Sequence, residues 1–490
     1  MTHPTQLWAM GACDLAELVR TRQASASEVV RAHLDRIDRV NPLVNAITVV
    51  LAEEALAAAD AADEALRRGE PPAPLTGVPM TVKENVDVEG SATTLGVAMW
   101  RGAVARHDAP HIGQLREAGA IPVGRGNMPE FGMRWHTDNQ LRGATLNPWS
   151  ARHTPGGSSG GDAAAVAVGM TPLGLGNDGA GSLRWPAQCC GVAALKPSLG
   201  RVPQGGRHGP AQPAPFAFQL LAVHGPIARQ VCDLRLAFGH MCGDRGSDPW
   251  YAPVPLEGPP VQTPVRVSVV TDPAGEGTHP AVAGALHRAA RLLADAGYVV
   301  TEDQPPALDR AGEIFHQIMS GYSRVREQQP PVETVAPGDF ARFWAGFEPA
   351  WTAAAGRPAF DPMMERVGIA SSWHAWMRQA PLVLAPVCTR PAFEVGSDLD
   401  PRWQAGWPAA IRLTVAVNLL GLPAVAVPVT TDGGLPQSVQ VIGPRFREDL
   451  CLAAAAVIEA GTGPLTPIDP APAGSIAASQ PPHSGSSPPG

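Results

Sequence analysis

The stretch PGGSSGG, Pro155 to Gly161, sets two adjacent serines between glycines and holds no large apolar side chain for a core. The alanine-rich segment that follows, Asp162 to Gly169, predicts a helix with Asp162 at its favourable N-terminal end. The serines are therefore expected in the turn before a helix, where backbone N–H groups are free to bind a ligand. A turn alone would need fewer small residues than this stretch contains.

A second glycine-serine cluster, GLGNDGAGSLRWP, occupies residues 174–186, and its serine, Ser182, follows Gly179, Ala180 and Gly181. Small residues allow a backbone to approach a ligand closely and to adopt conformations that other residues avoid. Consecutive N–H groups in such a loop can point at one oxygen and form an oxyanion hole. The cluster therefore indicates a site for acyl chemistry.

Two familiar motifs occur in these clusters without the context that each requires. GLGNDG, residues 174–179, matches the dinucleotide fingerprint, but Lys196 stands where that fingerprint needs an acidic residue. GSSGG, residues 157–161, matches a nucleophile elbow centred on Ser159, but NPWSARHTP before it is not a strand. We therefore disfavour nucleotide binding and a serine–histidine–acid hydrolase.

Lysine is almost absent from the chain. Lysine and arginine together number 37, and only Lys83 and Lys196 are lysines. Arginine stays charged at any working pH, whereas a buried lysine can be neutral and act as a base. Serine is a poor nucleophile without a base. Because Lys83 follows a short apolar strand, it is the candidate base for the serine pair.

The composition excludes several classes of function. The 490 residues carry a net charge of −8 and contain no long basic run, so we expect neither nucleic acid nor an anionic membrane as partner. The N-terminus shows no signal-peptide pattern, and no stretch of about 18 apolar residues predicts a membrane span. Seven cysteines without CxxC spacing fit a reducing cytoplasm and argue against a zinc site.

Helical and strand patterns alternate along the chain, which predicts an α/β fold with helices on both faces of its sheet. The length allows one large domain or two ordinary ones, and we adopt a single large domain. We place this domain at residues 1–465. The Pro/Ser/Gly-rich segment 466–490 is predicted to be a disordered tail. The tryptophan-containing middle, about residues 310–380, shows no clear period and is expected to face the substrate.

Taken together, these motifs resemble the amidase signature family. The resemblance rests on LTGVPMTVKENVD, GNMPEFG, TLNPW, TPGGSSGG and GLGNDGAGSLRWPAQCCGVAALKPS, with a weaker match from APVCTRP to GLPQSVQVIGPRFRED. It spans nearly the whole chain, from about residue 14 to 461, with its core at about 74–203. The resemblance implies an α/β fold with a central mixed sheet, and amide hydrolysis through an acyl-serine, without a metal or organic cofactor.

The resemblance also implies a role for individual residues. Lys83 matches the catalytic lysine, Ser158 matches a bridging serine on a cis peptide bond, and Ser182 matches the nucleophile. The implied oxyanion hole consists of the amides of Gly179, Ala180, Gly181 and Ser182, and the implied braces of that loop are Asp178 and Arg184. Ser159 is left with a local hydrogen bond, and Lys196 with a structural role.

The chain departs from the family pattern at three positions. Asn177 stands where Thr or Ser is usual, Ala180 where Gly is usual, and Asp162 where a small residue is commoner. Asn177 can keep a loop hydrogen bond, and the methyl group of Ala180 adds bulk beside the oxyanion hole. Asp162 is expected to cap its helix.

The substrate is predicted from aromatic residues. Met133, Trp135 and Trp185 are candidate pocket walls, and together with four tryptophans of the middle segment they favour an aryl or apolar acyl group. Those four are Trp344, Trp351, Trp373 and Trp376. An amidotransferase component that makes ammonia from glutamine for a partner protein, or a non-catalytic binding protein, stays open. A homodimer is compatible with the sequence.

Overall fold

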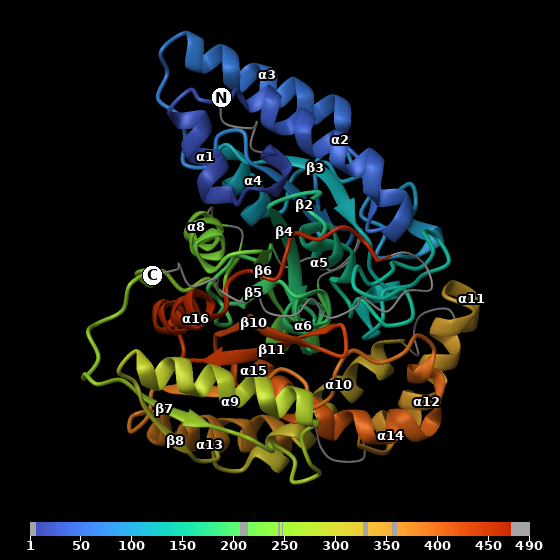
Figure 1. Ribbon diagram of the computed structural model, residues 1–490. Helices are drawn as coiled ribbons and strands as arrows, with labels where there is room; N and C mark the ends of the chain where they lie inside the picture. The colour runs from blue at the N-terminus through green and yellow to red at the C-terminus, as the bar shows by residue number, and fades with distance from the viewer. Residues whose placement is uncertain are drawn as a thin grey trace, which may run out of the picture.

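The computed structural model describes residues 6–205, 214–243, 246, 248–326, 332–354 and 360–471. Helices alternate with strands along the chain (Figure 1). The strands are β1 (Ile47–Val50), β2 (Pro79–Lys83), β3 (Ile121–Gly126), β4 (Leu173–Asp178), β5 (Ala193–Lys196), β6 (Val223–Ala228), β7 (Arg266–Val269), β8 (Val299–Glu302), β9 (Leu382–Pro386), β10 (Ala424–Asp432) and β11 (Leu435–Ile442).

The α-helices vary widely in length. They are α1 (Ala12–Arg20), α2 (Ala26–Val44), α3 (Ala52–Arg67), α4 (Pro110–Glu117), α5 (Gly160–Ala167), α6 (Arg184–Cys190), α7 (Phe216–Leu221), α8 (Val231–Met241), α9 (Pro280–Asp295), α10 (Leu308–Arg326), α11 (Val332–Val335), α12 (Asp339–Ala354), α13 (Phe360–Met377), α14 (Pro401–Ala410), α15 (Arg412–Leu420) and α16 (Glu448–Thr462). Short 3₁₀ turns are η1 (Leu7–Ala9), η2 (Ala98–Trp100), η3 (Glu130–Gly132) and η4 (Ser397–Leu399).

Local sequence signals explain where individual helices begin. Ser25 caps α2, because its side chain accepts a hydrogen bond from the amide of Glu28 while the Glu28 carboxylate accepts one from the amide of Ser25. At the start of α14, the Asp400 side chain accepts a hydrogen bond from the amide of Arg402.

The described strands form one mixed sheet of 11 strands in the order β1-β3-β2-β4-β6-β5-β10-β11-β9-β7-β8. β2 pairs in parallel with β3 and β4, and β7 pairs in parallel with β8 and β9. The remaining pairs are antiparallel. The expected single α/β domain with a central mixed sheet is confirmed.

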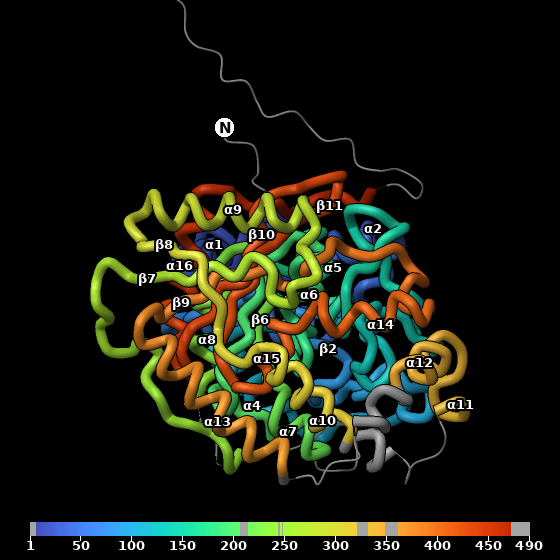
Figure 2. Tube along the Cα trace, turned by 90° about the horizontal axis from the view of Figure 1, so that it is seen from below, coloured from blue at the N-terminus to red at the C-terminus, as the bar shows by residue number. Residues whose placement is uncertain are grey.

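Helices cover both faces of this sheet, as neighbouring strand residues show. Ala194 and Ala426 belong to one apolar cluster, which also holds residues of α5, α6, α10 and α15. Leu195 and Val425 belong to a second cluster, with residues of α1, α8, α9 and α16. Helices α2 and α3 lie at one end of the molecule and α13 at the other (Figure 1), and α10, α12 and α13 gather along one side (Figure 2).

The beginning of the segment predicted as a tail packs against the domain. Thr466 is buried, the amide of Ile468 donates to the carbonyl of Ala167, and the amide of Ala471 donates to the carbonyl of Pro148. Composition alone misses such anchoring because it depends on backbone groups that the domain leaves open. Residues 472–490, the rest of the predicted tail, lie outside the described residues. No helix among those described has both the length and the apolar character that crossing a bilayer requires.

Candidate active site

Lys83 lies at the end of β2, the strand between β3 and β4, and its side chain is fully buried. The Nζ atom is 2.7 Å from Ser158 Oγ and 2.7 Å from Asn177 Oδ1. Asn177 in turn donates to Asn85 Oδ1 across 3.0 Å. The candidate base is thus held by two polar contacts, and one of them is to the predicted bridging serine.

The glycines around Ser158 give the loop its close contacts. The Gly157–Ser158 peptide bond is cis, as the family resemblance implies. A Cβ atom on Gly157 would lie 2.4 Å from the carbonyl oxygen of Arg134, so only glycine fits there. The amide of Ser159 donates to the carbonyl of Ser182 across 3.3 Å and ties the two serine loops together. The Ser159 hydroxyl makes only a 3.3 Å contact to the carbonyl of Asn177.

The loop that carries Ser182 is braced by a buried ion pair. Arg184 Nε lies 2.9 Å from Asp178 Oδ2, and neither side chain is exposed. Asn418 donates to Asp178 Oδ1 across 3.0 Å, and Arg184 also donates to Asn418 Oδ1 across 2.7 Å. Burial opposes the charge of Asp178, but Arg184 and these hydrogen bonds hold the pKa of its carboxyl below the usual range.

The amides proposed for the oxyanion hole differ in availability. The amide of Gly181 donates to Asp178 Oδ1 across 2.7 Å, so it already has an acceptor. Within the described residues, the amides of Gly179, Ala180 and Ser182 donate no hydrogen bond. These three are therefore the donors that can meet a developing oxyanion, while Gly181 anchors the loop.

Burial changes the protonation of Lys83. Desolvation lowers the pKa of its ammonium from 10.5 to about 7, although Asp162 and Asp178 oppose the shift. Near neutral pH a substantial fraction of this amine is uncharged and able to accept a proton. The neutral state that the chemistry requires is therefore accessible.

Asp162 lies inside the protein beside Lys83. It is in the first turn of α5, its side chain is fully buried, and neither carboxylate oxygen has a hydrogen-bond partner among the described residues. Its carboxyl carbon is 2.4 Å from where a Cβ of Gly126 would be, and Gly126 is in register with Lys83. Burial raises its pKa to about 7, against the effect of Thr81, Lys83 and Arg125. The expected helix cap is instead a titratable group beside the base.

Lys196, on β5, is also fully buried, and its Nζ donates to the carbonyl of Pro197 across 2.9 Å. Burial and the nearby Arg184 lower its pKa to about 7. This hydrogen bond of Lys196 is to a backbone carbonyl and not to either serine, so the structural role stays our prediction for it.

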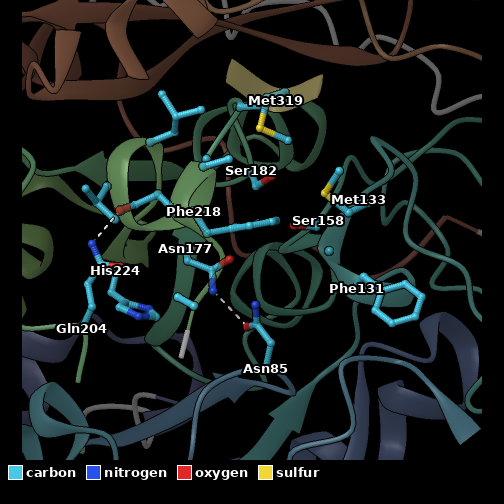
Figure 3. A pocket seen from close by; sticks show the side chains of 18 residues that line it. Asn85, Phe131, Met133, Ser158, Asn177, Ser182, Gln204, Phe218, His224 and Met319 are labelled. Carbon is cyan, nitrogen blue, oxygen red and sulfur yellow. Dashed lines mark hydrogen bonds between the residues drawn. The ribbon is translucent and has the colours of Figure 1, made fainter. Parts of the chain in front are cut away.

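The two serines open onto one cavity (Figure 3). Ser158, Ser182 and Asn177 lie in its wall together with Asn85, Gln204 and His224, and apolar side chains form the rest of the lining. Those apolar side chains are Phe131, Met133, Ala180, Ala214, Ala217, Phe218, Leu221, Ala222, Val223 and Met319. The enclosed space is small, about 60 Å³, and a larger cavity of about 800 Å³ shares Asn85, Gln204 and His224 with it.

Of the three pocket residues predicted from sequence, the structure places Met133 on the wall of this cavity. Trp135 and Trp185 are not among its described lining residues. They are buried behind it, where the Trp185 indole donates to the carbonyl of Trp135 across 3.0 Å and the Trp135 indole donates to that of Ala180 across 3.1 Å. Both rings also pack against Trp407. A substrate contact from either tryptophan stays a prediction.

The tryptophans of the middle segment lie away from the described lining. Trp344 and Trp373 are buried in the apolar core, and Trp376 packs against it. The side chain of Trp351 lies outside the described residues. The residues that sequence reasoning missed are Asn85, Gln204, Phe218, His224 and Met319. Asn85 had a signal, since it stands two positions after Lys83, whereas the others come from segments without a motif.

A family model described as Amidase matches residues 28–452. The chain belongs to the amidase family. A relative named indoleacetamide hydrolase, from Bradyrhizobium diazoefficiens, is 40% identical over 461 residues, which cover 94% of this chain and 88% of that protein. A second relative, from Moorella thermoacetica, is named as a component of glutamyl-tRNA(Gln) amidotransferase; it is 32% identical, and the match covers 93% of this chain and 97% of that protein.

Solved structures agree with this assignment. The structure of 6-aminohexanoate cyclic dimer hydrolase has a TM-score of 0.80, 29% identity, and coverage of 94% of this chain and 98% of that one. The resemblance read from the sequence is confirmed. This amidase is a hydrolase that acts on amide carbon–nitrogen bonds.

Proposed function

We propose that this amidase cleaves small amides with an apolar or aryl acyl group through a Lys83–Ser158–Ser182 relay. The observation that carries the proposal is the 2.7 Å contact of Lys83 Nζ with Ser158 Oγ at the wall of the cavity that Ser182 also lines. The distance between these heavy atoms suits a proton on either one, which a relay requires.

The relay balances without any other group. Ser182 Oγ attacks the amide carbonyl carbon as its proton passes to Ser158 Oγ, and the proton of Ser158 passes to neutral Lys83. The amides of Gly179, Ala180 and Ser182 stabilise the oxyanion. Lys83 then returns its proton through Ser158 to the leaving amine as the carbon–nitrogen bond breaks. Water, activated by the same relay, cleaves the acyl-serine ester and releases the acid.

The cavity supports an apolar acyl group. Its described lining contains no Asp, Glu, Lys or Arg, and side chains such as Phe131, Phe218 and Met319 would contact an apolar substrate. The relative named indoleacetamide hydrolase adds an arylacetamide to the candidates. We propose primary amides of short aryl or apolar acids as the substrate class.

A substrate screen tests this proposal. Ammonia release would be measured with indole-3-acetamide, phenylacetamide, benzamide and short aliphatic amides, alongside glutamine and asparagine. Turnover of aryl or apolar amides with wild-type enzyme and none with Ser182→Ala supports the proposal. Labelling of wild type by a fluorophosphonate at a residue other than Ser182 would refute the assigned nucleophile.

The amidotransferase reading is the second candidate, because a relative with that name matches nearly the whole chain. Free glutamine carries an ammonium and a carboxylate, which need charged or strongly polar partners on burial. The described lining of the cavity contains no charged partner of this kind, since it holds no Asp, Glu, Lys or Arg. Glutaminase activity together with a copurifying protein partner would favour this reading over the first.

A further inference from the structure

Cys13 and Cys232 come together on the sheet face opposite the α5 and α6 helices, although more than two hundred residues separate them in sequence. Cys13 is the second residue of α1, and Cys232 and Asp233 are in the first turn of α8. A ligand atom from each of these three residues lies within 4.8 Å of the other two. Cys232 is exposed, so the cluster is open to solvent.

The carboxylate of Asp233 has an unused oxygen. The side chain is fully buried, and Oδ1 accepts a hydrogen bond from the amide of Cys13 at 2.8 Å. This bond caps α1 and accounts for one oxygen only, because Oδ2 has no hydrogen-bond partner among the described residues. Burying a carboxylate oxygen without a partner is unfavourable. A cation beside it would supply the missing interaction.

The charges around the cluster also favour a cation. Glu459 lies close to the cluster, where its carboxyl group accepts a hydrogen bond from the amide of Val231 at 2.9 Å. Arg229 is the nearby basic group, and its guanidinium donates to the carbonyl oxygens of Val166, Thr171 and Met10. It therefore forms no ion pair with Asp233 at contact distance. The thiols of Cys13 and Cys232 and the carboxyl groups of Asp233 and Glu459 therefore lie close to little positive charge.

We propose that Cys13, Cys232 and Asp233 bind a divalent metal ion that accepts thiolate ligands, with Zn²⁺ the best match. Zn²⁺ favours thiolate with nitrogen or oxygen ligands in a tetrahedral arrangement. Each thiol releases its proton to solvent as its sulfur binds the metal, so the two thiolates and the carboxylate supply three ligands. The fourth position goes to water or to Gln230, whose Oε1 is 3.5 Å from Cys232 Sγ.

A metal at this place would join the N-terminal ends of α1 and α8. It lies apart from Lys83 and the serines, so its role would be to hold the N-terminal segment against the domain. The proposal is independent of the proposed function, since metal binding and amide hydrolysis have separate readouts.

Cobalt titration tests the site. Reduced, chelator-treated full-length enzyme would be titrated with Co²⁺, and the thiolate-to-cobalt charge-transfer band recorded. We expect the band to saturate at one Co²⁺ per chain, to disappear on adding Zn²⁺, and to be lost in Cys13→Ser and in Cys232→Ser. The melting temperature of wild type should rise with Zn²⁺, and that of Cys232→Ser should not.

Cys242→Ser is the matched control, because Cys242 is partly buried like Cys13 and lies outside the cluster. It should keep the full band. Circular dichroism would check the fold of each variant, and exposed Cys232 can be replaced even where Cys13→Ser proves unstable. No thiolate band in wild type, or an unchanged band in Cys232→Ser, overturns the proposal.

Discussion

Asp162 and Asp178 are both fully buried near the proposed catalytic residues, but the protein surrounds the two carboxylates differently. Asp178 receives hydrogen bonds from Arg184, Asn418 and the amide of Gly181, and its pKa is lowered. Asp162 receives none among the described residues, and its pKa is raised to about 7. The difference indicates that Asp178 is a permanent brace for the nucleophile loop, whereas Asp162 is a charge that can be switched by pH.

Each acid has a nearby cation whose chemistry matches it. Arg184, beside Asp178, stays charged at any working pH. Lys83, beside Asp162, has its pKa lowered to about 7 and can lose its proton. One pair thus holds the loop in place, whereas the other consists of two groups that can each change protonation near neutral pH.

The largest expected effect comes from giving position 83 a fixed positive charge, as Arg184 has beside Asp178. Lys83→Arg places a guanidinium that cannot become neutral where the base must accept a proton. We expect amide hydrolysis to fall by roughly 100- to 10,000-fold, the usual contribution of a general base. Steady-state rates of ammonia release measure this. Near-wild-type activity would reduce Lys83 to an electrostatic support.

The next largest effect is expected when the negative charge of Asp178, which braces the Ser182 loop, is removed. Asp178→Asn leaves the buried Arg184 guanidinium without its carboxylate, and losing one partner of a buried ion pair costs about 3–5 kcal/mol. We expect a lower free energy of unfolding in denaturant titrations together with lost activity. Arg184 also donates to Gln440 Oε1 across 2.8 Å. A variant as stable as wild type would show that this bond and the one to Asn418 are enough to hold Arg184.

Asp162→Asn should change the pH profile more than the stability. Removing the negative charge leaves burial to act on Lys83 with less opposition, so the pKa of Lys83 falls further. If Lys83 is the base, we expect acylation in wild type to increase with pH through about pH 7, as Lys83 loses its proton. In the variant this rise should move to lower pH, by about one pH unit.

The measurement is kcat/KM against pH for both proteins, with Asp162→Glu as the charge-conserving comparison. A profile that keeps its position in Asp162→Asn would mean that Asp162 does not act on Lys83. If, in addition, Ser182 of the wild-type enzyme does not react with acylating probes, the proposed Lys83–Ser158–Ser182 relay is wrong.

The smallest effect is expected at Ser159, the neighbour of the bridging serine. Its hydroxyl makes a 3.3 Å contact with the carbonyl of Asn177 and no contact with Lys83 in the described structure. Losing one neutral hydrogen bond costs about 0.5–1.5 kcal/mol. Ser159→Ala should therefore keep most of its activity, whereas Ser158→Ala should lose nearly all of it. The reverse result would restore the nucleophile-elbow reading.

The sequence predicted the parts of the site that lie within motifs. Ser158 and Ser182 line one cavity, and Lys83 contacts Ser158. Asp178 and Arg184 form an ion pair, as expected for residues that brace the loop. These residues sit at strand ends and in glycine-rich loops, where local sequence largely determines backbone shape. The α/β class followed from the alternation of helices and strands, and the mixed sheet followed from the family resemblance.

The sequence did not predict what depends on distant packing. Asp162 is predicted to be a helix cap until β3 and β4 are placed against α5, and Trp135 is predicted to line the pocket until Trp407 of α14 is found packed against it. The meeting of Cys13 with Cys232 likewise requires α1 to pack on α8. Local hydrophobic periodicity and residue spacing cannot predict such contacts between segments that are distant in sequence.

The recess that holds the Asp162 carboxylate is made by missing side chains. A Cβ on Gly126 would overlap the carboxyl group, and one on Gly174 would lie 3.0 Å from its Cβ. Alanine at Gly126 would therefore require the Asp162 carboxyl group to move or to be replaced by a smaller side chain. The two positions are sterically coupled, so a substitution at Gly126 is easiest once the residue at position 162 has become smaller. This coupling links a strand residue without a side chain to the acidity of Lys83, on which the charge of Asp162 acts.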